Sequence, residues 1–149
     1  MRRLWRWLSG LLGRGPRERL DADVRDIFLG ELDELTALLV SLRPVLQSRP
    51  DEVALREVRR AFHTIKGSGL MVGAVVLGSF CGRMEKLSLS LVEKRCKAPK
   101  ETLELIDNAI DLLPGCARAI RADRPLPGAI NVLDRRARSL LGDADLIGA

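Results

Sequence analysis

Residues 51–73 read DEVALREVRRAFHTIKGSGLMVG and carry a clear helical pattern. Apolar positions recur there at spacings of 3 and 4, at Leu55, Val58, Phe62, Ile65 and then Gly69. This period gathers them on one stripe of an α-helix, which must be buried against other elements. We expect the helix to begin at Pro50 and Asp51 and to end between about residues 67 and 73, where glycines cluster.

The same period continues on both sides of this helix. It predicts further helices over residues 21–47 and 74–94, a fourth from residue 99 to about 121, and a short one after residue 127 that ends before residue 142. Pro44 should bend or end the first of these helices, and Pro114-Gly115 should kink or interrupt the fourth. Short connections between amphipathic helices favour an antiparallel four-helix bundle.

Composition supports an all-α protein. Leucine occurs 27 times, aromatic residues make up only 3%, and tyrosine is absent, which favours helices over strands. The 149 residues suffice for one domain with tails. We expect the bundle at residues 21–121, a basic N-terminal segment with its linker at 1–20, and a C-terminal extension at 122–149.

The net charge of +5 belongs to the N-terminal tail. Residues 1–20 hold six arginines and one glutamate, whereas residues 21–149 hold 19 basic and 19 acidic side chains and are neutral. The body of the protein therefore gives no indication of nucleic-acid binding.

Residues 1–12, MRRLWRWLSGLL, alternate arginine with leucine and tryptophan, and we expect an additional amphipathic helix there. Contact with a membrane surface, packing on the domain and a frayed end are the alternatives. A secretory signal fits poorly, because the apolar stretch is interrupted. No apolar run is long enough for a transmembrane helix, and we expect a cytoplasmic protein.

The three cysteines are Cys81, Cys96 and Cys116, and none forms a C-x-x-C pair. With a single histidine in the chain, we expect no metal site and interpret the cysteines as small buried side chains.

That histidine, His63, lies about 130° from the apolar stripe of its helix and should face outward. An ordinary solvated surface histidine is one interpretation. Gly67, one turn further on, favours another, because glycine weakens a helix and must be useful there, for instance by letting a partner approach closely. Lys66 adds an ammonium group that could bind phosphate oxygens beside a nucleophilic imidazole.

The run His63-Thr64-Ile65-Lys66-Gly67-Ser68-Gly69, followed by Gly73-Ala74, resembles the motif of histidine phosphotransfer (HPt) domains. With Ala61-Phe62 before it and Leu70-Met71-Val72 after it, the run is most similar to HPt modules of chemotaxis-type kinases, especially of the pilus-motility branch. The resemblance covers roughly residues 21–121. It implies a four-helix bundle, usually monomeric, that exposes a phospho-accepting histidine in the middle of a helix.

The resemblance also implies a function. His63 would accept a phosphoryl group and pass it to an aspartate of a response-regulator receiver domain, which brings the Mg²⁺, so this chain would bind no cofactor itself. The partners would be the receiver domain and the catalytic domain of a histidine kinase. Autophosphorylation is not expected, because the sequence has no Gly-rich ATP-binding boxes.

The resemblance further implies roles for residues around His63. Chemotaxis-type members carry a glutamate 22 residues after the histidine, in a Met-Glu pair, and Met84-Glu85 match that spacing. Glu85 would accept a hydrogen bond from Nδ1–H of His63 and leave Nε2 to attack; a solvated helix charge is the alternative. Some members carry a second histidine three residues before this glutamate, where this chain has Gly82.

Four residues are candidates for partner binding: Gly67, Ser68, Leu70 and Arg59. Arg59 would steer an acidic receiver surface, although a plain solvated cation is as good an interpretation. A different function class also remains open, in which the bundle is a non-phosphorylated docking module for response regulators or pilus-regulatory proteins. The presence of His63, Lys66 and Glu85 together favours the phosphocarrier.

Overall fold

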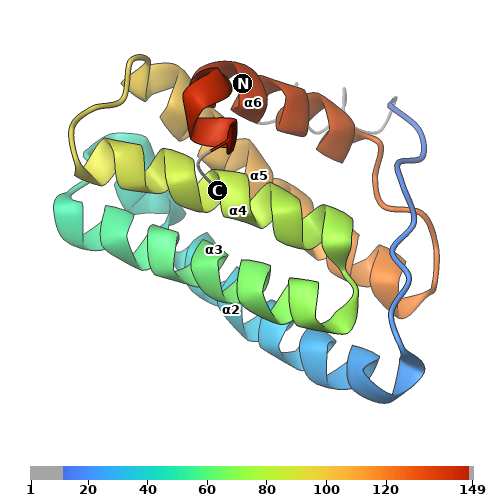
Figure 1. The fold of residues 1–149 in the computed structure, drawn as a ribbon. Helices are drawn as coiled ribbons and strands as arrows, with labels where there is room; N and C mark the ends of the chain where they lie inside the picture. The colour runs from blue at the N-terminus through green and yellow to red at the C-terminus, as the bar shows by residue number, and fades with distance from the viewer. Residues whose placement is uncertain (1–11, 148–149) are drawn as a thin grey trace.

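The computed structural model describes residues 12–147, which form helices without any strand. The helices are α2 (Ala22–Ser48), α3 (Glu52–Val72), α4 (Val75–Val92), α5 (Pro99–Arg121) and α6 (Ala129–Ile147). In Figure 1, α2 to α5 form the bundle, and α6 lies along α4 and α5. The predicted all-α bundle with a C-terminal helix is confirmed. The helix predicted over residues 1–12 lies almost entirely outside the described residues.

Local sequence signals set the helix ends around α3. The Asp51 carboxylate accepts a hydrogen bond of 2.7 Å from the backbone N–H of Ala54 and caps the N-terminus of the helix. Gly73 ends it in the left-handed conformation, with φ at 92°, which glycine adopts without strain. Only Ala74 then precedes α4, so α3 and α4 run antiparallel and side by side (Figure 1).

Neither internal proline ends or interrupts its helix, as the sequence had allowed. α2 continues for one turn past Pro44 to Ser48, and α5 continues without interruption past Pro114 to Arg121. Each proline removes one backbone hydrogen bond and strains the preceding turn. Burial of side chains beyond each proline, such as Leu46 and Ile120, outweighs that cost.

The core lies between the four bundle helices and α6. The predicted stripe of α3 faces it, with Phe62 and Val58 fully buried. At the end of the bundle near the α3–α4 turn, a Cβ atom on Gly69 would lie 3.4 Å from the Cα of Gly78. The two helices therefore approach closely, which brings the polar side chains along their shared edge within reach of each other.

The cysteines follow the prediction only in part. Cys81 and Cys116 are fully buried, as expected. Cys96 is only half-buried in the connection between α4 and α5, where its Sγ lies 3.3 Å from the hydroxyl of Thr102. No disulfide forms among these three thiols.

A buried ion pair joins α2 to α5. Arg43 of α2 binds the carboxylate of Asp107 on α5, with Nε 2.8 Å from Oδ1, and its Nη1 lies 3.2 Å from Asp111. Arg43 Nη2 donates to Oδ2 of Asp107 at 3.2 Å, and Gln47 adds a third donor to this carboxylate at 3.0 Å. Because the Arg43 side chain is buried, this cluster fixes how α2 sits against α5.

Both flanking segments pack on the bundle. Gly15 donates a backbone hydrogen bond of 2.6 Å to the carbonyl of Leu126. Glu18 is buried and accepts hydrogen bonds from the backbone N–H groups of Val76 and Leu77, at 3.0 and 2.7 Å. It therefore caps α4, whose own N-cap residue supplies no side-chain bond. The domain limits given above remain a prediction. None of the helices in the described range is both long and apolar enough to cross a membrane.

Candidate functional site

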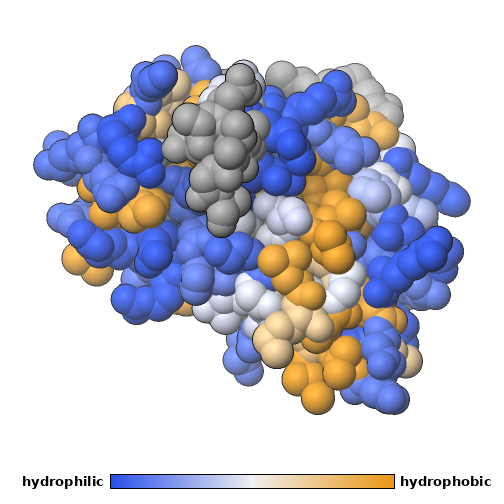
Figure 2. Space-filling model, viewed as in Figure 1, coloured by the Kyte–Doolittle hydropathy of each residue, from blue (hydrophilic) through white to orange (hydrophobic). Residues whose placement is uncertain are grey.

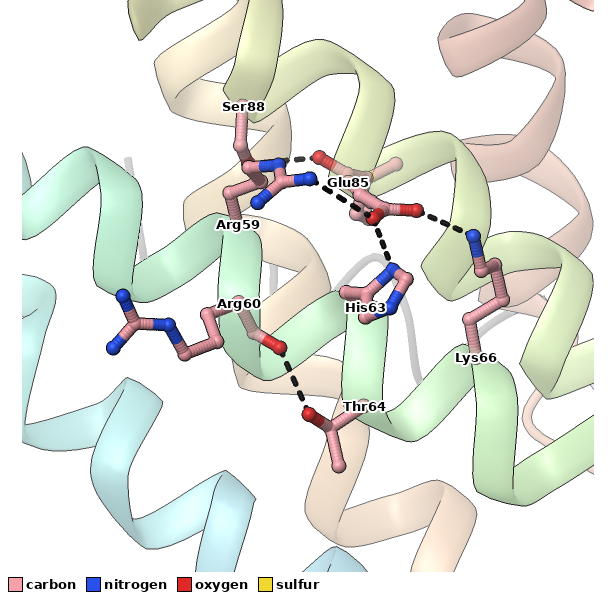
Figure 3. A network of polar contacts seen from close by, with 8 residues as sticks. Arg59, Arg60, His63, Thr64, Lys66, Glu85 and Ser88 are labelled. Carbon is pink, nitrogen blue, oxygen red and sulfur yellow. Dashed lines mark hydrogen bonds and ion pairs between the residues drawn. The ribbon is translucent and has the colours of Figure 1, made fainter. Parts of the chain in front are cut away.

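His63 lies in the middle of α3, and its side chain is 57% exposed, which agrees with the predicted outward orientation. The ring leans toward α4 rather than standing free in solvent (Figure 3). There its Nδ1 atom forms a short hydrogen bond with Oε2 of Glu85. The ring is thus held on one side only, and the side that carries Nε2 is left without a protein partner in this network.

Glu85 is the centre of the site. It lies on α4, its side chain is only 10% exposed, and it is therefore not the solvated charge that was the alternative interpretation. Its Oε1 atom accepts a hydrogen bond of 2.7 Å from Nζ of Lys66, and its Oε2 atom lies 3.9 Å from the guanidinium of Arg59. Three nitrogen-bearing side chains of α3 therefore converge on one carboxylate (Figure 3).

The charge state of Glu85 decides the tautomer of His63. Burial raises the pKa of Glu85, but hydrogen bonds from Lys66 and His63 and the charge of Lys66 outweigh burial and hold the pKa below its ordinary value. The group is therefore a carboxylate near neutral pH, which can only accept hydrogen bonds. We accordingly assign the proton of the neutral ring to Nδ1, which leaves a lone pair on Nε2.

Lys66 is held by Glu85 and is not extended into solvent. Its side chain is 32% exposed, so part of the side chain remains accessible beside His63. The aliphatic stem of Lys66 runs across Gly82 of α4, where a Cβ atom would lie 2.9 Å from Cδ of the lysine. The sequence identified Gly82 only as a departure from the family motif. A glycine one turn before Glu85 was the available signal for this contact.

The candidate partner-binding residues lie on the same exposed side of α3 or beside it. Gly67 is exposed, and no other atom lies within 4 Å of where its Cβ would be, so nothing in the described residues fills that space. Leu70 is partly exposed, and its side chain rests on Gly78 of α4. Ser68 instead donates a short hydrogen bond to Glu31 and so joins α3 to α2.

Within residues 12–147, no His, Cys, Asp or Glu side chains gather in a group that could hold a metal ion. The site is instead a polar cluster with one exposed imidazole, built on two adjacent helices of an all-α bundle. A family model described as the Hpt domain matches residues 23–123. The chain belongs to the Hpt domain family. No curated protein is similar enough to match the chain.

Hpt domains are histidine phosphotransfer modules of phosphorelays, and they generally interact with kinases and with receiver domains of response regulators. In this Hpt domain, an apolar surface at the C-terminal end of α3, about two turns from His63, was missed from the sequence. Met71 is 89% exposed and Val75 is 56% exposed, and both lie next to Leu70 in sequence or across the α3–α4 turn. Figure 2 shows this apolar surface over the end of α3 and the start of α4. In the sequence, the available signal for this surface was the pair of apolar residues Met71 and Val75 on either side of the helix end.

Proposed function

We propose that this Hpt domain carries a phosphoryl group on Nε2 of His63 and passes it to a receiver aspartate in a chemotaxis-like, pilus-motility type of phosphorelay. The observation that carries the proposal is the hydrogen bond between Nδ1 of His63 and the buried carboxylate of Glu85. It fixes the tautomer that leaves Nε2 nucleophilic on an exposed face. The chemotaxis context rests only on the sequence resemblance.

The transfer step balances without a separate base. The Nε2 lone pair attacks phosphorus, the N–P bond forms, and the bond from phosphorus to the donor oxygen breaks, so that the donor aspartate leaves as a carboxylate. The ring keeps its Nδ1 proton and becomes positively charged. Glu85 stabilises that developing charge through the hydrogen bond it already accepts. In the reverse direction the phosphoryl group leaves for a receiver aspartate, and the ring returns to its neutral form.

Two cationic side chains, Lys66 and Arg59, lie beside the Glu85 carboxylate and favour the binding of a phosphoryl group and of an acidic partner. One Lys66 proton is used by Glu85, and the other two can be donated to the phosphoryl group when it arrives. Arg59 lies one turn before His63 and adds positive charge that favours an acidic partner surface. Receiver domains would supply the Mg²⁺, and the chain itself supplies the positioned imidazole.

The exposed surface around His63 suits a protein donor. Gly67 leaves open space one turn from the nucleophile, and Leu70, Met71 and Val75 offer apolar area about two turns from it, at the end of α3 and the start of α4. A receiver domain that docks there would bury this area while its aspartate meets Nε2. Steering by charge and burial of apolar side chains would thus act on adjacent parts of one surface.

The test is phosphorylation of the purified chain by phosphoramidate, with a His63→Gln variant beside it. We expect a mass gain of one phosphate that is acid-labile and base-stable in the wild type and absent from the variant. His63 is exposed, so the variant should keep its helical circular dichroism and change stability by less than about 0.5 kcal/mol. No phosphate on the folded wild type with several donors would contradict the proposal and favour a docking module that binds partners without phosphate.

A further inference from the structure

Gly82 has no conformational reason to be glycine. It lies inside α4, and its φ is not positive. Among the described glycines, those with positive φ are Gly13, Gly73 and Gly142. Glycine within a helix destabilises it relative to alanine, so its presence here requires a local reason.

The reason lies in the space above its Cα. A Cβ atom at position 82 would be 2.9 Å from Cδ and 3.4 Å from Cγ of Lys66, and real Cβ contacts are essentially never as short as the first distance. The stem of Lys66 would therefore have to shift if any other side chain were placed at this position. From there the ammonium group reaches Oε1 of Glu85 at 2.7 Å.

We propose that Gly82 is a positioning residue for phosphotransfer. Because it has no side chain, it leaves the space through which Lys66 reaches from α3 to Glu85. A side chain at this position displaces the lysine stem and removes the ammonium group from both Glu85 and the phosphoryl oxygens. The proposal rests on the proposed function for its effect on phosphate transfer, but the contact itself can be tested without it.

The consequence for Glu85 can be measured directly. Its neighbours in the cluster are Lys66, His63 and Arg59, and of the two permanent cations Lys66 lies closer to the carboxylate, at 2.7 Å against 3.9 Å for Arg59. Because the hydrogen bond from Lys66 is the largest influence that lowers the pKa of Glu85, loss of this bond should raise that pKa toward its ordinary value. A purely structural disturbance elsewhere in the bundle would not have this effect.

The experiment compares Gly82→Ala, Lys66→Ala and the double variant. Gly30→Ala is the matched control, because it makes the same change on a helix where no atom lies within 4 Å of the added Cβ. For each protein we would measure thermal stability, the titration of the Glu85 carboxyl by carbon NMR, and the initial rate of phosphorylation by phosphoramidate.

We expect Gly82→Ala to fold with the helical circular dichroism of wild type, to raise the pKa of Glu85 and to slow phosphorylation by about tenfold, equivalent to one charge-assisted hydrogen bond. If Gly82 acts through Lys66, the double variant should be no slower than Lys66→Ala alone. Gly30→Ala should leave both the titration and the rate unchanged.

Two results would overturn the proposal: a Glu85 titration in Gly82→Ala that is unchanged from wild type, or a double variant markedly slower than Lys66→Ala. If the wild type accepts no phosphate at all, the proposed function fails, and the Glu85 titration alone still decides the role of Gly82.

Discussion

Replacing Glu85 by glutamine tests the charge at the centre of the site. Glutamine keeps the length of the side chain and an oxygen that can accept from Nδ1 of His63, but it removes the negative charge. In the native protein that carboxylate is only 10% exposed and takes hydrogen bonds from His63 and Lys66. A hydrogen bond to a charged group is worth about 1.5–3 kcal/mol, so its weakening as the imidazolium develops should slow phosphorylation by about 10- to 100-fold.

The assay is the initial rate of phosphorylation by phosphoramidate at constant pH, with Glu52→Gln as the control. Glu52 makes the same kind of pair with Arg56 on the exposed face of α3, where the change should alter neither the rate nor, beyond about 0.5 kcal/mol, the stability. A Glu85→Gln variant that reacts as fast as wild type would refute the electrostatic argument and leave Glu85 only an orienting role.

We also expect the difference in stability between wild type and Glu85→Gln to depend on pH. The pKa of Glu85 is lower in the folded protein than its ordinary value, so its charge contributes stability above the unfolded pKa, and this contribution is lost as the pH falls through the folded pKa. We therefore expect urea unfolding to show a stability difference between wild type and Glu85→Gln near pH 7 that shrinks below about pH 4. A difference that grew on acidification would contradict the direction of the shift.

Three further predictions concern other parts of the molecule. Gly67→Ala should stabilise the protein by about 1 kcal/mol and raise the melting temperature by about 3 °C, because the added Cβ meets no atom. The variant should accept phosphate more slowly from a phosphorylated receiver but at an unchanged rate from phosphoramidate; equal effects on both donors would remove the role of Gly67 in partner approach. Arg43→Ala should lower the free energy of unfolding in urea by about 3 kcal/mol, because the buried carboxylate of Asp107 loses its arginine partner. Arg56→Ala on the surface should cost under about 0.5 kcal/mol, and similar losses for both variants would contradict the importance of burial for this ion pair. If residues 1–12 bind a membrane surface, the full chain should sediment with anionic liposomes, and a variant that lacks them should not.

The sequence was informative where structure depends on local period. The stripe of α3 predicted both the buried face with Phe62 and the exposed side of His63, because 100° per residue fixes which side chains share a face. The prolines show the limit of that reasoning. Pro114 weakens a helix locally, yet packing of the residues beyond it keeps α5 continuous, and packing cannot be read from a single segment.

The sequence by itself determined that the chain is helical, that α3 begins at its Asp51 cap and ends at Gly73, and that one imidazole faces outward from α3. Only the tertiary structure decided that Lys66 lies across Gly82, that Arg43 is buried against Asp107, and that Glu18 caps α4 from another segment. The physical reason is that these contacts depend on the rotation and axial shift of one element against another. Those quantities come from how the whole core packs, whereas a helical period is repeated along each segment and can be read there alone.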